Sequence, residues 1–88
     1  MVPTLVAAGR TIVVGSDSPF PGLVPGWSLH DEAGLLVVAG LEPLDVMRAL
    51  TAGNAEVLGD PDAGSIRVGG RADLVAFEGD PTATIADL

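Results

Sequence analysis

The chain has 88 residues, of which 48% are hydrophobic and only 3% aromatic, and its formal net charge is −8. An acidic chain lacks the basic surface that nucleic acids and anionic membranes require, so we expect it to bind neither. The absence of cysteine excludes disulfides and cysteine metal sites. No basic region followed by a long apolar core opens the chain and no apolar run has the length of a membrane span, so we expect a cytoplasmic protein.

The same composition is unusually apolar for a small free-standing domain. Such a domain exposes a large share of its surface to water and normally carries more polar residues on its outer faces. The composition is therefore closer to that of a segment from the interior of a larger α/β protein than to that of a small independent domain.

A helix followed by a buried strand is predicted at the start of the chain. Residues 4–8 are largely apolar and end at Gly9, as in the last turns of a helix with a glycine C-cap. The β-branched run 11–14, followed by Gly15, indicates a strand covered on both faces, as in a parallel sheet. Asp17 comes just after it, where such sheets place ligand-binding groups, although an aspartate here is equally typical of a turn.

A loop rich in proline and glycine is expected over residues 18–27. It is longer than most connections from a strand to a helix, and long loops often carry function. Phe20 and Trp27 either line a pocket from this loop or pack the loop down, and the sequence leaves both alternatives open.

Two helices are predicted after this loop. Ser28 and Asp31 have the spacing of a capping box with the serine at the N-cap, so the first helix should run to about Ala39 and stop at Gly40. Pro43 suits the first position of the second helix. The core-facing stripe of that second helix is Leu44, Met47 and Leu50.

Short strands are predicted towards the C-terminus. Residues 54–58 form one more helical turn closed by Gly59, and residues 60–64 form a turn cluster. Residues 65–68 and 73–77 then indicate two strands, which puts a boundary near residue 61 between a helical part and a β part. Two short strands do not make a stable sheet, so they need partners from elsewhere.

Few residues have the chemistry of a catalytic site. No nucleophile elbow surrounds Ser16 or Ser18, and His30 would be the single imidazole base, which disfavours a serine hydrolase. For a metal, Asp17 and His30 are the candidate ligands near the end of the predicted strand, whereas catalytic zinc usually takes about three protein ligands. A histidine near the start of a helix is more often packed or solvent-facing than a ligand.

Several segments, taken in order, carry a family resemblance. They are residues 15–19 (Gly-Ser-Asp-Ser-Pro), 28–32 (Ser-Leu-His-Asp-Glu) and 39–44 (Ala-Gly-Leu-Glu-Pro-Leu), followed by residues 64–75 (GSIRVGGRADLV) and their continuation at 78–81. The sequence resembles the amidohydrolase superfamily, in its imidazolonepropionase-like branch. Residues 64–75 are similar to the signature with which these enzymes return to their small β-sandwich.

The resemblance implies an α/β fold that is the C-terminal fragment of a (β/α)8 barrel. Residues 11–15 would be its eighth strand, residues 1–61 the last βα portion, and residues 62–88 the C-terminal strands of the composite β-sandwich. Asp17 would correspond to the strand-8 aspartate of the family, which faces the metal, takes a proton from the attacking water and delivers it to the leaving nitrogen. The implied substrate pocket includes Ser18, Phe20, Trp27 and His30.

The reaction implied by the resemblance is hydrolysis of a C–N bond in an amide or cyclic amide, with a divalent metal, zinc, as cofactor. The family's histidine ligands and bridging lysine lie on earlier strands, and this sequence has one histidine and no lysine. Glu42, Gly53-Asn54 and Gly70 also depart from the family pattern. We therefore expect the chain alone to be inactive, to hold no metal tightly and to need the N-terminal barrel portion as its partner.

An alternative of a different class also follows from the sequence. A non-catalytic remnant with open β edges and bare helix faces would self-associate or bind another protein, because unpaired edges and apolar surface favour pairing.

Overall fold

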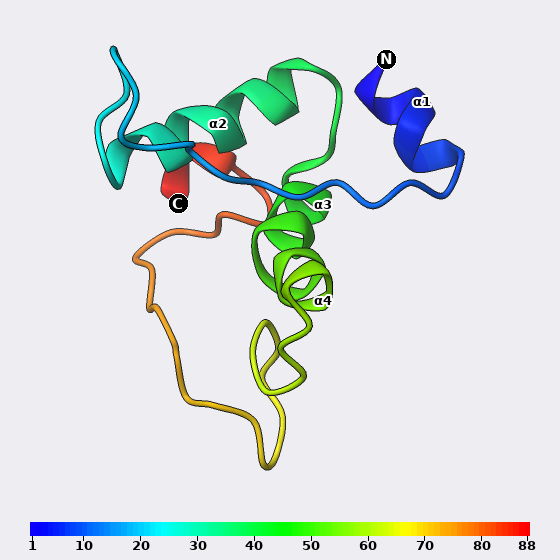
Figure 1. Ribbon diagram of the computed structural model, residues 1–88, viewed down its shortest axis with the longest axis vertical. Coiled ribbons are helices and arrows are strands. Elements are labelled where there is room, and N and C mark those ends of the chain that lie inside the picture. The colour runs from blue at the N-terminus through cyan, green and yellow to red at the C-terminus, as the bar shows by residue number, and fades with distance from the viewer.

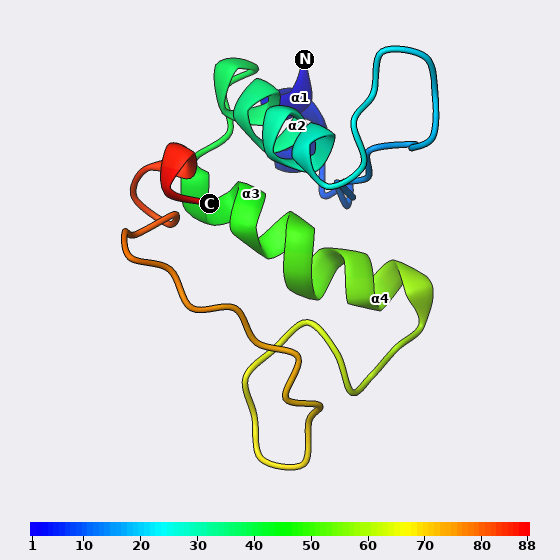
Figure 2. The same cartoon turned by 90° about the vertical axis from the view of Figure 1, so that its left-hand side faces the viewer.

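The computed structural model describes residues 1–88, which form helices joined by irregular segments (Figures 1 and 2). The backbone angles at Arg48, Ala49 and Gly53 stay in the right-handed helical region, so α3 (Pro43–Arg48), η1 (Ala49–Gly53) and α4 (Asn54–Leu58) form one continuous rod, seen best in Figure 2. No helix is both long and apolar enough to cross a membrane. The elements are the α-helices α1 (Val2–Ala7), α2 (Trp27–Val38), α3 (Pro43–Arg48) and α4 (Asn54–Leu58), the π-helical turn η1 (Ala49–Gly53) and the 3-10 turn η2 (Ile85–Asp87).

Glycines end the helices at three of the predicted positions. Gly9, Gly40 and Gly59 have φ angles of 74°, 103° and 70°, a left-handed conformation that glycine adopts without strain. In each case the next residue donates its N–H to the carbonyl five positions earlier, which completes a Schellman motif: Arg10 to Leu5, Leu41 to Leu36 and Asp60 to Ala55. The second predicted helix also begins at Pro43, as expected.

The predicted capping box at Ser28 is wrong. Helix α2 begins two residues earlier than predicted, at Trp27, and its N-cap is Gly26, which offers no side chain for a cap. The Ser28 hydroxyl instead accepts a hydrogen bond from the Val24 N–H at 2.8 Å, and the Ser28 N–H donates to the Val24 carbonyl at 2.9 Å. Ser28 therefore fastens the preceding loop to the first turn of α2 instead of capping it.

The core is small and lies where α2, α3 and η2 meet. Only 8 of the 88 residues are buried, and Val46 is the one large side chain that is fully buried. Ala33 of α2 and Leu41 of the α2–α3 connection complete the centre of this cluster. Partly buried side chains surround it: Val2, Leu36, Val37, Leu50, Ile85 and Leu88.

None of the predicted strands is formed within the chain. Residues 11–15, 65–68 and 73–77 belong to irregular segments and pair with no other segment through a β ladder. A strand is stabilised by hydrogen bonds to a neighbouring strand, and no neighbour is present among these residues. The barrel fold and the division near residue 61 remain predictions, while α2, α3 and α4 all lie before that residue.

Candidate active-site segment

Asp17 lies on an irregular segment that crosses the molecule from the end of α1 towards the start of α2 (Figure 1). Its φ angle of 53° makes it the one residue other than glycine in the left-handed region. Aspartate tolerates this conformation better than most residues, and such conformations cluster at functional sites. The side chain is exposed and forms no hydrogen bond or ion pair, so the Asp17 carboxylate is accessible to a ligand.

The segment that carries Asp17 is attached to the rod by one side chain, that of Asn54. The Val14 N–H donates to Asn54 Oδ1 at 2.9 Å, and Asn54 Nδ2 donates to the Val14 carbonyl at 2.8 Å. Val14 is also the only buried residue of the segment, with 7% of its surface exposed. Asn54 therefore satisfies both backbone polar groups of a residue that lies forty positions earlier in the chain.

Gly53 lets the segment approach the rod closely. A side-chain Cβ at this position would lie 3.4 Å from the Ile12 carbonyl oxygen and 3.4 Å from that of Arg48. The backbone of residues 11–15 therefore lies against the helix over Gly53 and Asn54, which depart from the usual Asn-Pro of the family resemblance.

The other predicted pocket residues are only partly brought together. Trp27 and His30 lie on the first turn of α2 with their ring centroids 6.2 Å apart. Phe20 and Trp27 are 63% and 66% exposed, so neither packs the loop into a core. The Ser18 hydroxyl is buried without a hydrogen-bond partner. No hydrogen bond or ion pair connects Asp17 with any of them.

A metal does not fit the residues of this chain alone. A catalytic zinc takes about three protein ligands. No three side chains of histidine, cysteine, aspartate or glutamate gather anywhere in the structure, and Asp17 and His30 do not become members of such a group.

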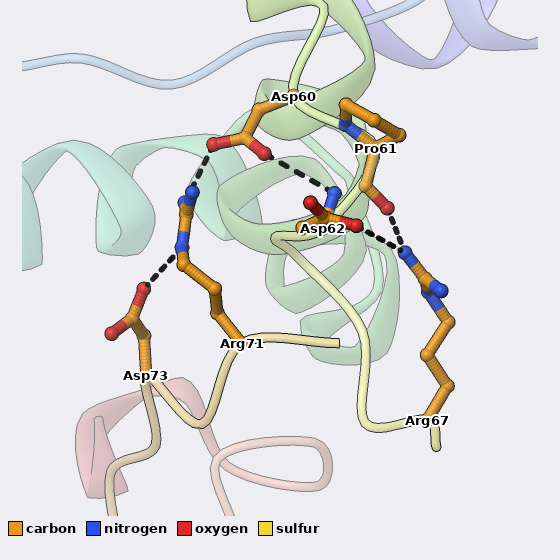
Figure 3. A network of polar contacts seen from close by, with 6 residues as sticks. All are labelled: Asp60, Pro61, Asp62, Arg67, Arg71 and Asp73. Carbon is orange, nitrogen blue, oxygen red and sulfur yellow. Dashed lines mark hydrogen bonds and ion pairs between the residues drawn. The ribbon is translucent and has the colours of Figure 1, made fainter. Parts of the chain in front are cut away.

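A network of charged side chains lies beyond the end of α4 (Figure 3). Arg71 pairs with Asp60 at 2.5 Å and with Asp73 at 3.0 Å. Arg67 donates to the Pro61 carbonyl and lies 3.4 Å from Asp62. The hydrogen bond from Arg71 lowers the pKa of Asp60, and the hydrogen bond to Asp60 raises the pKa of Arg71.

A mostly apolar hollow of about 450 Å³ lies between the rod, α2 and residues 63–77. Leu29 and His30 reach it from α2, and Met47 and Leu50 reach it from the rod. Leu74 and Phe77, from the last predicted strand, also line this hollow.

The sequence indicated Asp17 but not the role of Asn54 or of the Asp60–Arg71 pair. Asn54 stood out only as a departure from the family pattern, and Asp60 only as a turn residue. Each has its partner at a distance along the chain, so no local motif reveals either contact.

Comparisons with known proteins agree with the resemblance in the sequence. The sequence profile of the amidohydrolase family matches residues 1–88. Adenine deaminase 2 of Agrobacterium fabrum (strain C58 / ATCC 33970) is 41% identical over 76 residues, which cover 85% of this chain and 13% of that protein. No solved structure matches. The chain belongs to the amidohydrolase family.

Proposed function

We propose that this chain acts as the C-terminal part of a metal-dependent amidohydrolase that hydrolyses C–N bonds, with Asp17 as its acid and base. The observation that carries the proposal is the accessible Asp17 carboxylate, held in a left-handed conformation just after the apolar run 11–15. Family membership supports the reaction class, since the profile covers the residues around Asp17.

In the proposed fold, residues 11–15 form the last strand of a (β/α)8 barrel and residues 62–88 add strands to a β-sandwich. The exposure of apolar side chains supports this fold, because Ile66 and Val75 are 89% and 76% exposed in the chain alone. The backbone of residues 72–79 also makes no hydrogen bond, which leaves it free to join a sheet supplied by the N-terminal part of the enzyme.

Asp17 suits proton transfer. A carboxylate at the end of a barrel strand can accept a proton from the attacking water and return it to the leaving nitrogen, which becomes an amine or ammonia. In such enzymes a divalent metal, here proposed to be zinc, supplies a Lewis acid. Asp17 would face that metal as the contribution of this chain, while the remaining ligands would come from outside it, because no group of three ligands forms here.

The proposed substrate is a small molecule with an amide, cyclic amide or comparable C–N bond. Ser18, Phe20, Trp27 and His30 are the proposed lining of its pocket, and the exposure of the two large rings leaves them able to contact it. The name of the Agrobacterium relative points to deamination of adenine, which is also a hydrolytic cleavage of a C–N bond.

A graft tests this proposal directly. The part of Adenine deaminase 2 that aligns with this chain is replaced by the corresponding residues of this chain, and ammonia release from adenine is measured together with the metal content. We expect the graft to deaminate adenine and Asp17→Asn to lower kcat by at least about a hundredfold, the usual range for loss of an acid and base.

Glu56→Gln provides the matched control, because it neutralises an exposed carboxylate on α4 that forms no hydrogen bond or ion pair with the Asp17 segment. Activity that survives Asp17→Asn within twofold would overturn the role of Asp17. A graft that folds and holds the parent's metal but releases no ammonia would contradict the proposed function of the chain.

The alternative function, a self-associating or partner-binding module, also draws on the exposed apolar residues. The family match does not favour it. Size-exclusion chromatography with light scattering separates the two: a discrete oligomer with cooperative unfolding would support the module, whereas a chain without a defined oligomer would support the enzyme part.

A further inference from the structure

Helix α2 is apolar on two sides, and the chain covers only one of them. Ala33 and Leu36 face the core that α3 and η2 complete. The other side carries Trp27, Leu35 and Val38, which share one face of the helix and are 66%, 61% and 84% exposed. A helix that is apolar all round belongs to the interior of a larger structure, so this second face calls for a cover that the chain does not supply.

The uncovered face of α2 is hollowed where it meets η2, with the two elements side by side in Figure 1. Leu35 and Val38 line this groove from α2, and Ile85 and Ala86 line it from η2. Gly34 also lies in the groove, and a Cβ there would meet nothing within 4 Å, which leaves room for an inserted side chain. None of the groove residues belongs to a predicted strand, so pairing of those strands in a sheet does not remove the groove.

One carboxylate, that of Asp31, lies in the groove. It is exposed and forms no hydrogen bond or ion pair within the chain. A carboxylate that is covered without a partner loses its hydration and gains nothing in return, so the covering surface has to offer a positive group opposite Asp31. A second copy of the chain suits this groove poorly, because each copy carries a net charge of −8.

We propose that the α2–η2 groove is the docking site for the N-terminal part of the same enzyme, through a segment with apolar side chains and one lysine or arginine opposite Asp31. The proposal rests on the proposed function, in which this chain is the C-terminal part of an amidohydrolase. The Agrobacterium relative supports this occupant, since the aligned residues make up only 13% of that protein and the remainder is available to cover the groove.

Thiol labelling tests whether the groove is covered. The chain has no cysteine, so Leu35→Cys places a single reporter in the groove. We expect this thiol to react with a maleimide at least about tenfold more slowly in the deaminase graft than in the 88-residue chain, because a covered side chain reacts only when the interface opens. Mass spectrometry of the peptide that contains position 35 measures the rate. Glu32→Cys, on the same helix but outside the groove, is the matched control and should react at similar rates in both proteins.

Asp31→Arg tests the positive group in the partner. It would place two like charges opposite each other, so it should raise the labelling rate of Leu35→Cys in the graft at least about tenfold. Glu32→Arg makes the same change of charge one residue along the helix, outside the groove, and should leave the labelling slow. Labelling that stays equally slow with Asp31→Arg would overturn the positive partner group.

The labelling rate separates this proposal from the proposed function. Equal labelling of Leu35→Cys in the chain and in the graft would overturn the docking site, even if the graft deaminates adenine. Slow labelling in a graft that releases no ammonia would contradict the proposed function and support the docking site. Slow labelling in the 88-residue chain itself, with a dimer detected by light scattering, would show that a second copy occupies the groove and would also overturn the proposal.

Discussion

Asp60 and Arg71 form an ion pair at 2.5 Å across eleven residues of sequence, and Arg71 also reaches Asp73 at 3.0 Å. The pair connects the end of the rod to the beginning of the last predicted strand. Because the side chains of Arg71 and Asp73 are more than half exposed and that of Asp60 is about one third exposed, the pair adds little to the free energy of unfolding, but it lowers the pKa of Asp60.

The pKa of Asp60 offers a test of this network. Arg71 lowers the pKa, so the stabilisation is complete above the ordinary aspartate pKa and is lost as the pH falls through the lowered value. Arg71→Gln should therefore raise the pKa of Asp60 towards its ordinary value, as measured by NMR titration of the carboxyl carbon. Arg67→Gln, which removes the contact with Asp62 instead, should leave the pKa of Asp60 unchanged. An Asp60 pKa that Arg71→Gln does not move would contradict the ion pair.

Alanine substitutions at Gly64 and Gly69 distinguish the effect of backbone strain from that of steric overlap with the rod. Both have positive φ angles, 81° and 85°, so an alanine at either position is strained by about 1–2 kcal/mol. A Cβ on Gly64 would also lie 2.7 Å from Ala55 Cβ and 2.8 Å from the Thr51 carbonyl, whereas a Cβ on Gly69 would meet nothing within 4 Å. Gly64→Ala should lower the free energy of unfolding by about 1–3 kcal/mol more than Gly69→Ala does, measured by urea unfolding. Equal effects would show that the loop does not pack against the rod.

Val46 tests the small core. Its side chain is fully buried. Val46→Ala removes two methyl groups and should reduce the free energy of unfolding by about 2 kcal/mol, through lost apolar burial and the cavity left behind. Val68→Ala makes the same chemical change at a fully exposed site and should have almost no effect on thermal unfolding. A Val46→Ala chain as stable as the Val68→Ala chain would mean that this cluster is not the core.

Ser28→Ala tests the corrected role of the hydroxyl. The Val24 N–H would lose its acceptor, which should destabilise the loop by about 1 kcal/mol and speed exchange of the Val24 amide. The start of α2 should stay at Trp27, because Gly26 and not Ser28 is its N-cap. Carbon chemical shifts that show the first turn of α2 unwinding would restore the capping-box interpretation.

The features predicted correctly from the sequence are those that a few neighbouring residues determine. Gly40 and Gly59 end helices because glycine adopts the left-handed conformation that a Schellman motif needs, and Pro43 starts one because its fixed φ suits the first helical turn. Ser28 has the spacing of a capping residue, but its hydroxyl accepts a hydrogen bond from the Val24 N–H in the preceding loop.

The remaining features depend on residues that are far apart or lie outside the chain. The strand at residues 11–15 was expected from its β-branched residues, but a β ladder needs a neighbouring strand. Because none is present in this chain, the N–H and C=O of Val14 form hydrogen bonds with the Asn54 side chain instead. Asp17 was placed by its position after that run and by family resemblance. No property of its neighbours in sequence indicates that a helix forty residues later fixes the backbone beside it.

The way η2 packs has a practical consequence for handling the protein. Ile85 and Leu88 lie against the core cluster of Ala33, Leu41 and Val46, and Asp87 accepts a hydrogen bond from the Asp80 N–H at 3.0 Å. An affinity tag or fluorescent fusion joined after Leu88 would therefore begin beside the core and disturb the packing of Ile85 and Leu88 against it. Met1, which is 91% exposed, offers a point of attachment in solvent.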